Sequence, residues 1–118
     1  MAVSQRKIDK WAKKKKIAKL HKALSDKDPQ IRVAVVEAFG TIDHDDARNN
    51  IIAALRDPEP IVRAAAVTAL AKIGNDRVLE FVRKVSIDDT DETVRAKATD
   101  AYATLKARIA ELEKATYN

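Results

Sequence analysis

Two histidines, His21 and His44, are the residues of this chain whose type comes closest to catalytic or metal-binding chemistry. His44 stands in the run Asp43-His44-Asp45-Asp46, which offers an imidazole nitrogen and carboxylate oxygens to a metal ion. A built metal site normally draws ligands from more than one segment, however, and this run falls where a turn is expected. An aspartate in such a turn can cap a helix that begins near Asp46. We therefore interpret the run as a helix start and expect no metal site.

Other residue arrangements that carry catalysis are missing from the sequence. The chain has no cysteine, which excludes disulfides, thiolate nucleophiles and cysteine-ligated zinc or iron–sulfur centres. It also has no glycine-rich phosphate-binding loop and no Ser-His-Asp arrangement. No apolar run is long enough to span a bilayer, and the N-terminus lacks an apolar signal-peptide core. The sequence thus predicts a cytoplasmic protein that is not an enzyme and needs no cofactor.

Lysines give the sequence its strongest electrostatic signal. Residues 1–24 carry nine basic residues against one acidic residue, a net charge of +8, whereas residues 25–118 carry −3. Six lysines form a basic patch around Trp11: Lys10, Lys13, Lys14, Lys15, Lys16 and Lys19. Such a patch can bind the phosphates of a nucleic acid, with the indole stacked on a base, or it can be a solvated helix face. Trp11 pairs at helical spacing with Ile8, which favours packing of both side chains on the core.

An internal repeat determines how these residues are positioned. The segment Leu24–Arg32 aligns with Leu55–Arg63, and the two share leucine, aspartate, proline, β-branched and arginine positions. A third, looser copy follows at Asp89–Leu105 and lacks the proline. Three copies of one unit are therefore expected.

The alignment extends upstream and places His21. Leu20 and His21 align with Ile51 and Ile52, and then with Phe81 and Val82. Since its equivalents are apolar, His21 is expected to pack in or near the first core layer.

Each copy has the pattern of a helix pair. Pro29 and Pro60 suit a first helical turn, and Asp28 and Glu59 precede them as N-caps. The pattern predicts helices at 5–25, 29–42, 46–56, 60–73, 76–86 and 91–115. The apolar residues of the first helix change face along its length, so a break is expected near Lys13–Lys16.

One helix pair cannot bury its apolar face alone, so the three pairs are expected to stack. We predict an all-α fold, an α-solenoid of three helix pairs, as a single domain over residues 1–118. It comprises a basic leader at 1–16, repeats at about 17–43, 44–74 and 75–106, and a C-terminal helix extension at 107–118. Ile109 and Leu112 continue the apolar stripe of the last helix, so the extension either caps the stack or pairs with a second copy.

The segment from Asp57 to Gly74, Asp-Pro-Glu-Pro-Ile-Val-Arg-Ala-Ala-Ala-Val-Thr-Ala-Leu-Ala-Lys-Ile-Gly, resembles a HEAT repeat. It is similar to the short bacterial and archaeal variety also found in phycobilisome-lyase-like proteins, and the resemblance covers about residues 17–106. This resemblance implies a solenoid whose second helices line a concave surface that binds proteins or, in some members, nucleic acid. It also implies a structural ladder between units, formed by Asp26, Arg32, Asp57, Arg63, Asp89 and Arg95. The iron-binding hydroxylases of this family use His-Glu pairs, and none occurs here.

A protein partner is expected on the face lined by the second helices. The residues assigned to it are small or weakly charged: Val33, Glu37, Ala64, Thr68, Ala96 and Asp100. We therefore predict a non-catalytic interaction module or small scaffold. One alternative is a nucleic-acid-associated factor that binds through the lysine-rich first helix, and a weaker one is an accessory subunit of a lyase-like enzyme.

Overall fold

The computed structural model describes residues 2–117; Met1 and Asn118, the ends of the domain predicted over 1–118, lie outside the described residues. This part of the chain forms helices and no strand. The elements are α1 (Gln5–Lys13), α2 (Ile17–Ala23), α3 (Pro29–Phe39), α4 (Asp45–Ala54), α5 (Pro60–Ile73), the 3₁₀ turn η1 (Asp76–Val78), α6 (Leu79–Asp88) and α7 (Glu92–Tyr117).

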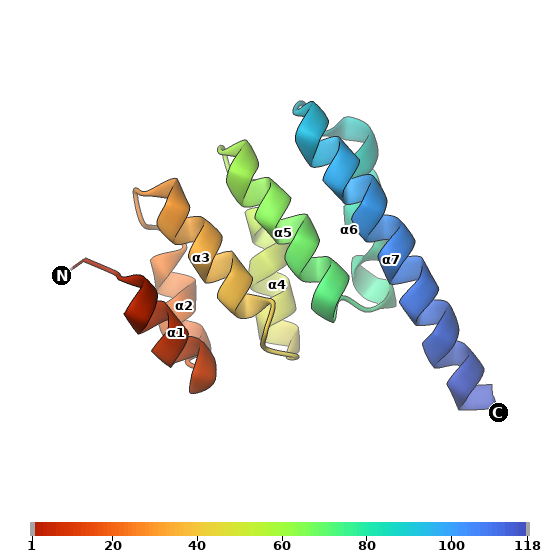
Figure 1. Cartoon of the computed structure of the whole chain (residues 1–118), viewed down its shortest axis with the longest axis horizontal. Coiled ribbons are helices and arrows are strands. Elements are labelled where there is room, and N and C mark those ends of the chain that lie inside the picture. The colour runs from red at the N-terminus through yellow and green to blue at the C-terminus, as the bar shows by residue number, and fades with distance from the viewer. Residues whose placement is uncertain (1, 118) are drawn as a thin grey trace.

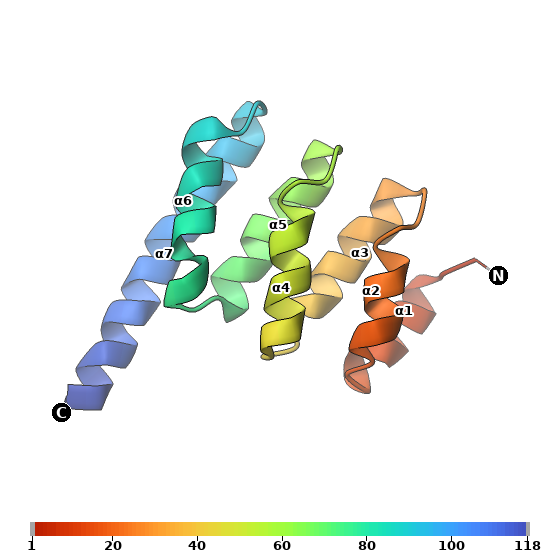
Figure 2. The same cartoon turned by 180° about the vertical axis from the view of Figure 1, so that it is seen from behind.

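The helices lie in two layers. Helices α1, α3, α5 and α7 lie side by side in one layer (Figure 1), and α2, α4 and α6 cover it from behind (Figure 2). The pairs α2–α3, α4–α5 and α6–α7 follow one another along the stack, which measures 50 × 34 × 16 Å. The shortest dimension fits two helix layers whose axes are about 8–10 Å apart.

The helix predicted over 5–25 is broken in two, at the place where its apolar residues change face. α1 ends at Lys13 and α2 begins at Ile17, and between them Lys15 has a left-handed φ of 53°. The turn allows fully buried Ile8 on α1 and fully buried Leu20 on α2 to contact the same core. α1 packs against α3 and lies in the layer of the second helices, so it covers the open side of the first pair.

The core shows that the alignment of the third unit was wrong by one residue. Leu20, Ile51 and Val82 are fully buried and equally spaced along the chain, whereas Phe81 is 45% exposed. Asp57 and Asp89 are 32 residues apart, however, so the third unit has one extra residue between Val82 and Asp89, in the last part of α6. His21 is exposed, so the expectation that it packs in the core layer was wrong too.

The capping side chains of α4 and α5 differ from those predicted. Asp28 accepts a hydrogen bond from the Gln30 amide, as predicted, but the side chain of Glu59 makes no capping bond. At α4 the capping side chain is that of His44, which accepts from the Asp46 amide, and no aspartate caps there. The imidazole Nδ1 does here what a carboxylate oxygen does at other caps.

Gly74 ends α5 because only a glycine fits beside the following turn. A Cβ at this position would lie 2.5 Å from Val78 Cγ2 and 2.9 Å from Leu105 Cδ2, well inside van der Waals contact. The close approach lets η1 and α7 pack directly against the end of α5.

The C-terminal extension belongs to α7, which runs unbroken to Tyr117. Arg108, near the start of the extension, donates hydrogen bonds to the carbonyls of Ala71, Lys72 and Gly74 at the end of α5. A cation at a helix C-terminus also offsets the partial negative charge there. Further along, Leu112 is 60% exposed. The beginning of the extension thus caps α5.

Candidate partner-binding face

Helices α1, α3, α5 and α7 make one face of the molecule, which we call the second-helix face. The residues predicted to hold a partner differ in how exposed they are on this face. Glu37, Thr68, Ala96 and Asp100 are exposed and Ala64 is half-buried. Val33 is half-buried and packs against the core.

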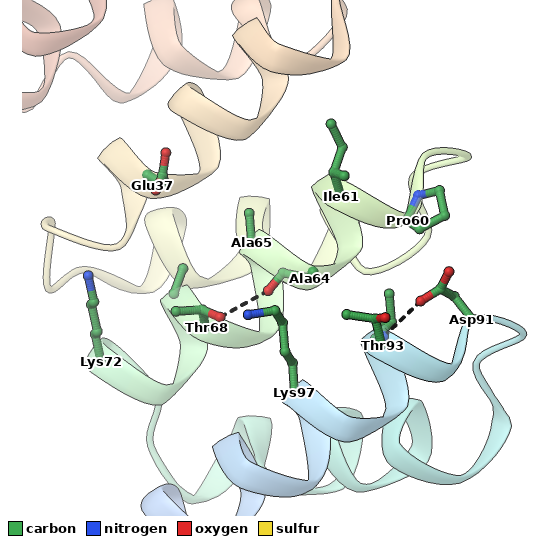
Figure 3. A pocket seen from close by; sticks show the side chains of 12 residues that line it. Glu37, Pro60, Ile61, Ala64, Ala65, Thr68, Lys72, Asp91, Thr93 and Lys97 are labelled. Carbon is green, nitrogen blue, oxygen red and sulfur yellow. Dashed lines mark hydrogen bonds between the residues drawn. The ribbon is translucent and has the colours of Figure 1, made fainter.

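A groove of about 520 Å³ runs along α5, and we call it the α5 groove (Figure 3). Glu37, Ala64 and Thr68 line it, whereas Val33, Ala96 and Asp100 do not. Its other lining residues come from α5, the start of α7 and the turn before α7: Pro60, Ile61, Ala65, Ala69, Lys72, Asp91, Thr93, Val94 and Lys97. Glu37 stands on α3, so three neighbouring helices form the groove.

The α5 groove has an apolar floor, and its rim carries two lysines and two carboxylates. Alanines give it a smooth surface, and Ile61 presents an apolar side chain that is 44% exposed. Lys97 extends from α7 towards α5, and Lys72 stands further along α5 (Figure 3). Among the described residues neither lysine forms an ion pair. The groove suits an apolar segment that carries acidic groups.

Two polar side chains of the groove are already engaged within the protein. The Thr68 hydroxyl donates to the Ala64 carbonyl at 3.1 Å, and Asp91 Oδ1 accepts from the Val94 amide at 2.9 Å. Asp91 thereby caps α7, and the partial positive charge at the helix N-terminus stabilises its negative charge.

A second hollow, of about 970 Å³, lies between α1 and α3, and we call it the lysine groove. Lys10, Lys13, Lys14 and Lys15 line one side, together with Gln5, Asp9 and Ala12 of α1. The α3 side is lined by Ala34, Glu37, Ala38 and the nearby Thr41. Glu37 therefore borders both grooves.

The structure does not bring all six lysines of the predicted basic patch together. Lys16 precedes α2, and Lys19 lines a separate hollow beside α2 together with Trp11. The indole is half-buried and packs against the core, as its spacing from Ile8 suggested.

Four of the six predicted ladder residues pair across unit boundaries, whereas Asp26 and Arg95 bond within their own units. Arg32 donates from Nε and Nη2 to both carboxylate oxygens of Asp57, at 2.9 and 3.1 Å, and Arg63 binds Asp89 with the same two distances. These pairs are largely buried, the Arg63 and Asp89 side chains being 12% and 6% exposed. A bidentate pair of this kind fixes the orientation of the two side chains as well as the distance between them.

Each arginine of the ladder also binds its own unit. Nη1 of Arg32, Arg63 and Arg95 donates to the carbonyl of Asp26, Asp57 and Asp89 respectively. Hydrogen bonds to Asp57 and Asp89 raise the pKa of Arg32 and Arg63 above the usual range. Burial alone would raise the pKa of Asp89, but hydrogen bonds from Arg63 and the Asp91 amide outweigh it and lower the pKa.

The histidines and their neighbouring acids are used in structural contacts. His21 Nδ1 lies 2.5 Å from Asn50 Oδ1, which joins α2 to α4. Arg48 pairs with Asp43 at 2.6 Å and with Asp45 at 2.7 Å, and its hydrogen bond lowers the pKa of Asp45. Arg48 also donates to the Ile73 carbonyl. Within residues 2–117 no three acidic or histidine side chains converge as metal ligands would.

The family model for HEAT repeats matches residues 17–103. The chain belongs to the HEAT-repeat family. The predicted family and the predicted all-α solenoid are thereby confirmed, and the match does not distinguish the phycobilisome-lyase-like variety from other HEAT repeats. A search of the curated proteins gives no match.

HEAT repeats generally mediate protein–protein interaction or scaffolding, and the family is typically non-catalytic. The matched residues include α5, the α5 groove and the Arg–Asp pairs. α1 and the end of α7 lie outside the match, so the lysine groove joins a HEAT helix to a segment that precedes the repeats. In the described part of the chain no helix combines the length and the apolar character needed to cross a bilayer.

Sequence reasoning missed the groove residues Ile61, Lys72 and Lys97. Together with Ala64, Ala65 and Thr68, the first two form one stripe of α5 at helical spacing. That stripe was readable from the sequence. The contribution of α7 was not, because it depends on how the neighbouring HEAT unit stacks.

Proposed function

We propose that this HEAT-repeat chain is a non-catalytic interaction module that holds a peptide segment or helix of a partner protein in the α5 groove. The observation that carries this proposal is the floor of alanines beside the exposed Ile61 side chain. Small side chains allow the partner backbone to approach closely, and an exposed isoleucine gives it apolar surface to bury. The family-level role in protein interaction supports the same interpretation.

Binding through nucleic-acid phosphates has less support. Trp11 packs against the core, so its indole faces are not both free to stack on a base. The six lysines lie on two helices and in the turn between them rather than in one track. No feature of the described residues favours the accessory-subunit alternative.

A peptide-display selection tests the proposal. The wild-type protein is the bait, and a Thr68→Arg variant, which fills the α5 groove with a long charged side chain, is used to remove peptides that bind elsewhere. The matched control is Thr116→Arg, because the Thr116 hydroxyl also bonds the carbonyl four residues earlier but lies far from the groove. We expect peptides whose affinity falls at least tenfold with Thr68→Arg and less than twofold with Thr116→Arg. Peptides that bind all three proteins equally would refute the proposal.

A further inference from the structure

The α5 groove and the lysine groove are adjacent parts of one surface. Helices α1, α3 and α5 are neighbours in the same layer (Figure 1), and Glu37 of α3 lines both grooves. A segment lying across α3 therefore contacts both.

The charge of this combined surface is unbalanced. Six lysines line it: Lys10, Lys13, Lys14 and Lys15 in the lysine groove, and Lys72 and Lys97 in the α5 groove. Within the described residues none of the six forms a salt bridge. Three carboxylates, Asp9, Glu37 and Asp91, line the same surface, so positive charges exceed negative ones by three. Asp9 accepts from the Gln5 amide group and Asp91 caps α7, so both already bond within the protein. The surface thus offers several ammonium groups that lack an acidic partner.

We propose that the occupant of this surface is an acidic peptide segment, with its apolar residues in the α5 groove and a cluster of aspartates or glutamates over the lysine groove. This inference rests on the proposed function and specifies the chemistry of the partner. It follows from the charge complementarity of the lysine groove and from its continuity with the apolar groove.

The spacing of the helices sets the distance between the two parts of the segment. Neighbouring packed helices lie about 8–10 Å apart, so α1 and α5 are separated by roughly 16–20 Å. An extended chain covers that distance in about six residues and a helix in about 12. An acidic cluster directly next to the apolar residues would reach Lys72 and Lys97 but not the four lysines of the lysine groove.

A peptide fits the combined surface better than a nucleic acid does. The Glu37 carboxylate stands where the two grooves meet, and a phosphate backbone crossing α3 would pass it. The floor of the α5 groove is made of alanines and lacks an aromatic side chain for base stacking. A peptide can place a neutral or basic residue opposite Glu37.

The test uses fluorescent peptides with three aspartates separated from a Leu-Ala-Ala-Leu block by two, six or ten Gly/Ser residues, in both orders. We expect the six-residue spacer to bind at least fivefold more tightly than the two-residue spacer. We expect affinity to fall at least tenfold with the variant Lys10→Glu, Lys13→Glu, Lys14→Glu. The control Lys19→Glu, Lys22→Glu, Lys84→Glu makes the same change of net charge at exposed lysines of the other layer, and should change affinity less than threefold.

Circular dichroism verifies folding, and the milder Lys→Gln versions of both triple variants keep the comparison available should a glutamate version unfold. Equal losses in the two triple variants, or no dependence on spacer length, would overturn the inference. Tighter binding of a single-stranded oligonucleotide in competition with the peptide would overturn it as well. A result in which Thr68→Arg abolishes binding and the lysine variants have no effect would reject the acidic partner while leaving the proposed function standing.

Discussion

At the scale of single residues, two of the ladder aspartates, Asp57 and Asp89, each make two kinds of contact with the same carboxylate. Oδ1 of Asp57 accepts the amide of Glu59, and Oδ1 of Asp89 accepts the amide of Asp91, while both carboxylates bind the arginine of the preceding unit. The turn before each second helix is therefore held in shape by the group that joins the units. A change at either aspartate disturbs the turn and the contact between units together.

The pair of Arg63 and Asp89 makes stability depend on acid. Because the pKa of Asp89 is lower in the folded chain than the unfolded value of about 3.9, ionised Asp89 stabilises the fold above that value. This contribution is lost as the pH falls through the folded pKa. We expect Asp89→Asn to reduce the free energy of unfolding by about 1–2 kcal/mol at pH 7, and the difference from wild type to shrink towards pH 3.

Urea denaturation at pH 7, 5, 4 and 3 measures this difference. Asp88→Asn, at an exposed neighbouring position, is the control and should change stability by less than about 0.5 kcal/mol at pH 7. A difference for Asp89→Asn that grows as the solution becomes more acidic would contradict the expectation.

The resemblance to a HEAT repeat was enough to single out the ladder residues, but not the direction of their pairing. Arg32 lies six residues after Asp26 and 25 residues before Asp57, and it pairs with the distant carboxylate while it bonds only the carbonyl of the near residue. Sequence spacing favours the near partner, whereas stacking places the distant one in front of the guanidinium. His21 failed as a prediction for a related reason, because the neighbouring α4 offers Asn50 and so lets an exposed position remain polar.

At the scale of elements, α1 is a structural part of the stack rather than a free leader. Its Ile8 is fully buried, and Trp11 packs against the same core. The break after it was predictable from the change of apolar face. The position of α1 beside α3 was not, because helical periodicity shows which side of a helix is buried and leaves its neighbour undetermined.

The turn between α1 and α2 holds Lys15 in a conformation that side chains other than glycine, asparagine and aspartate adopt reluctantly. We expect Lys15→Gly to stabilise the fold by about 0.5–1 kcal/mol, because glycine reaches a positive φ without steric strain. Lys14, with a φ of −89°, is the matched control, and Lys14→Gly should be neutral or destabilising. Thermal denaturation compares the two, and a similar change in both variants would show that the left-handed backbone of Lys15 is not the cause.

Helix starts were predicted better than helix ends. Pro29 and Pro60 each begin their helix as expected, since a proline tolerates the first turn and fixes its φ. α3 ends at Phe39, short of the predicted end at Ile42, because the chain tightens there into short-range turns: Thr41 and Ile42 donate to the carbonyls of Ala38 and Phe39. The C-terminal ends of α4 and α6 carry no proline or glycine, so the sequence does not mark the residues at which these helices end.

At the scale of the whole molecule, the helices of the second-helix face pack on their neighbours in that layer, α1 on α3, α3 on α5 and α5 on α7, and α7 packs most closely on α6. Elements in the middle of such a stack have neighbours on both sides, and those at its ends have one. We expect hydrogen exchange to be slowest in Val62–Leu70 of α5. It should be at least tenfold faster in α1 and in the last three turns of α7.

Mass spectrometry of fragments after exchange in deuterated water resolves these regions. The same protection in α1, α5 and the end of α7 would mean that the chain opens only as one unit, contrary to the expectation.

The direction of the ladder has a consequence for how such a chain can grow. The middle unit supplies Arg63 for the next unit and Asp57 for the previous one, and Arg32 and Arg63 occupy the same position in consecutive units. A duplicated unit inserted between two others therefore brings both halves of the bond that its new junctions require. Gene duplication in steps of one whole unit lengthens the solenoid without leaving a buried charge unpaired. The pair also tolerates a small change of unit length, because Arg63 and Asp89, 26 residues apart, bond at the same distances as Arg32 and Asp57, 25 residues apart.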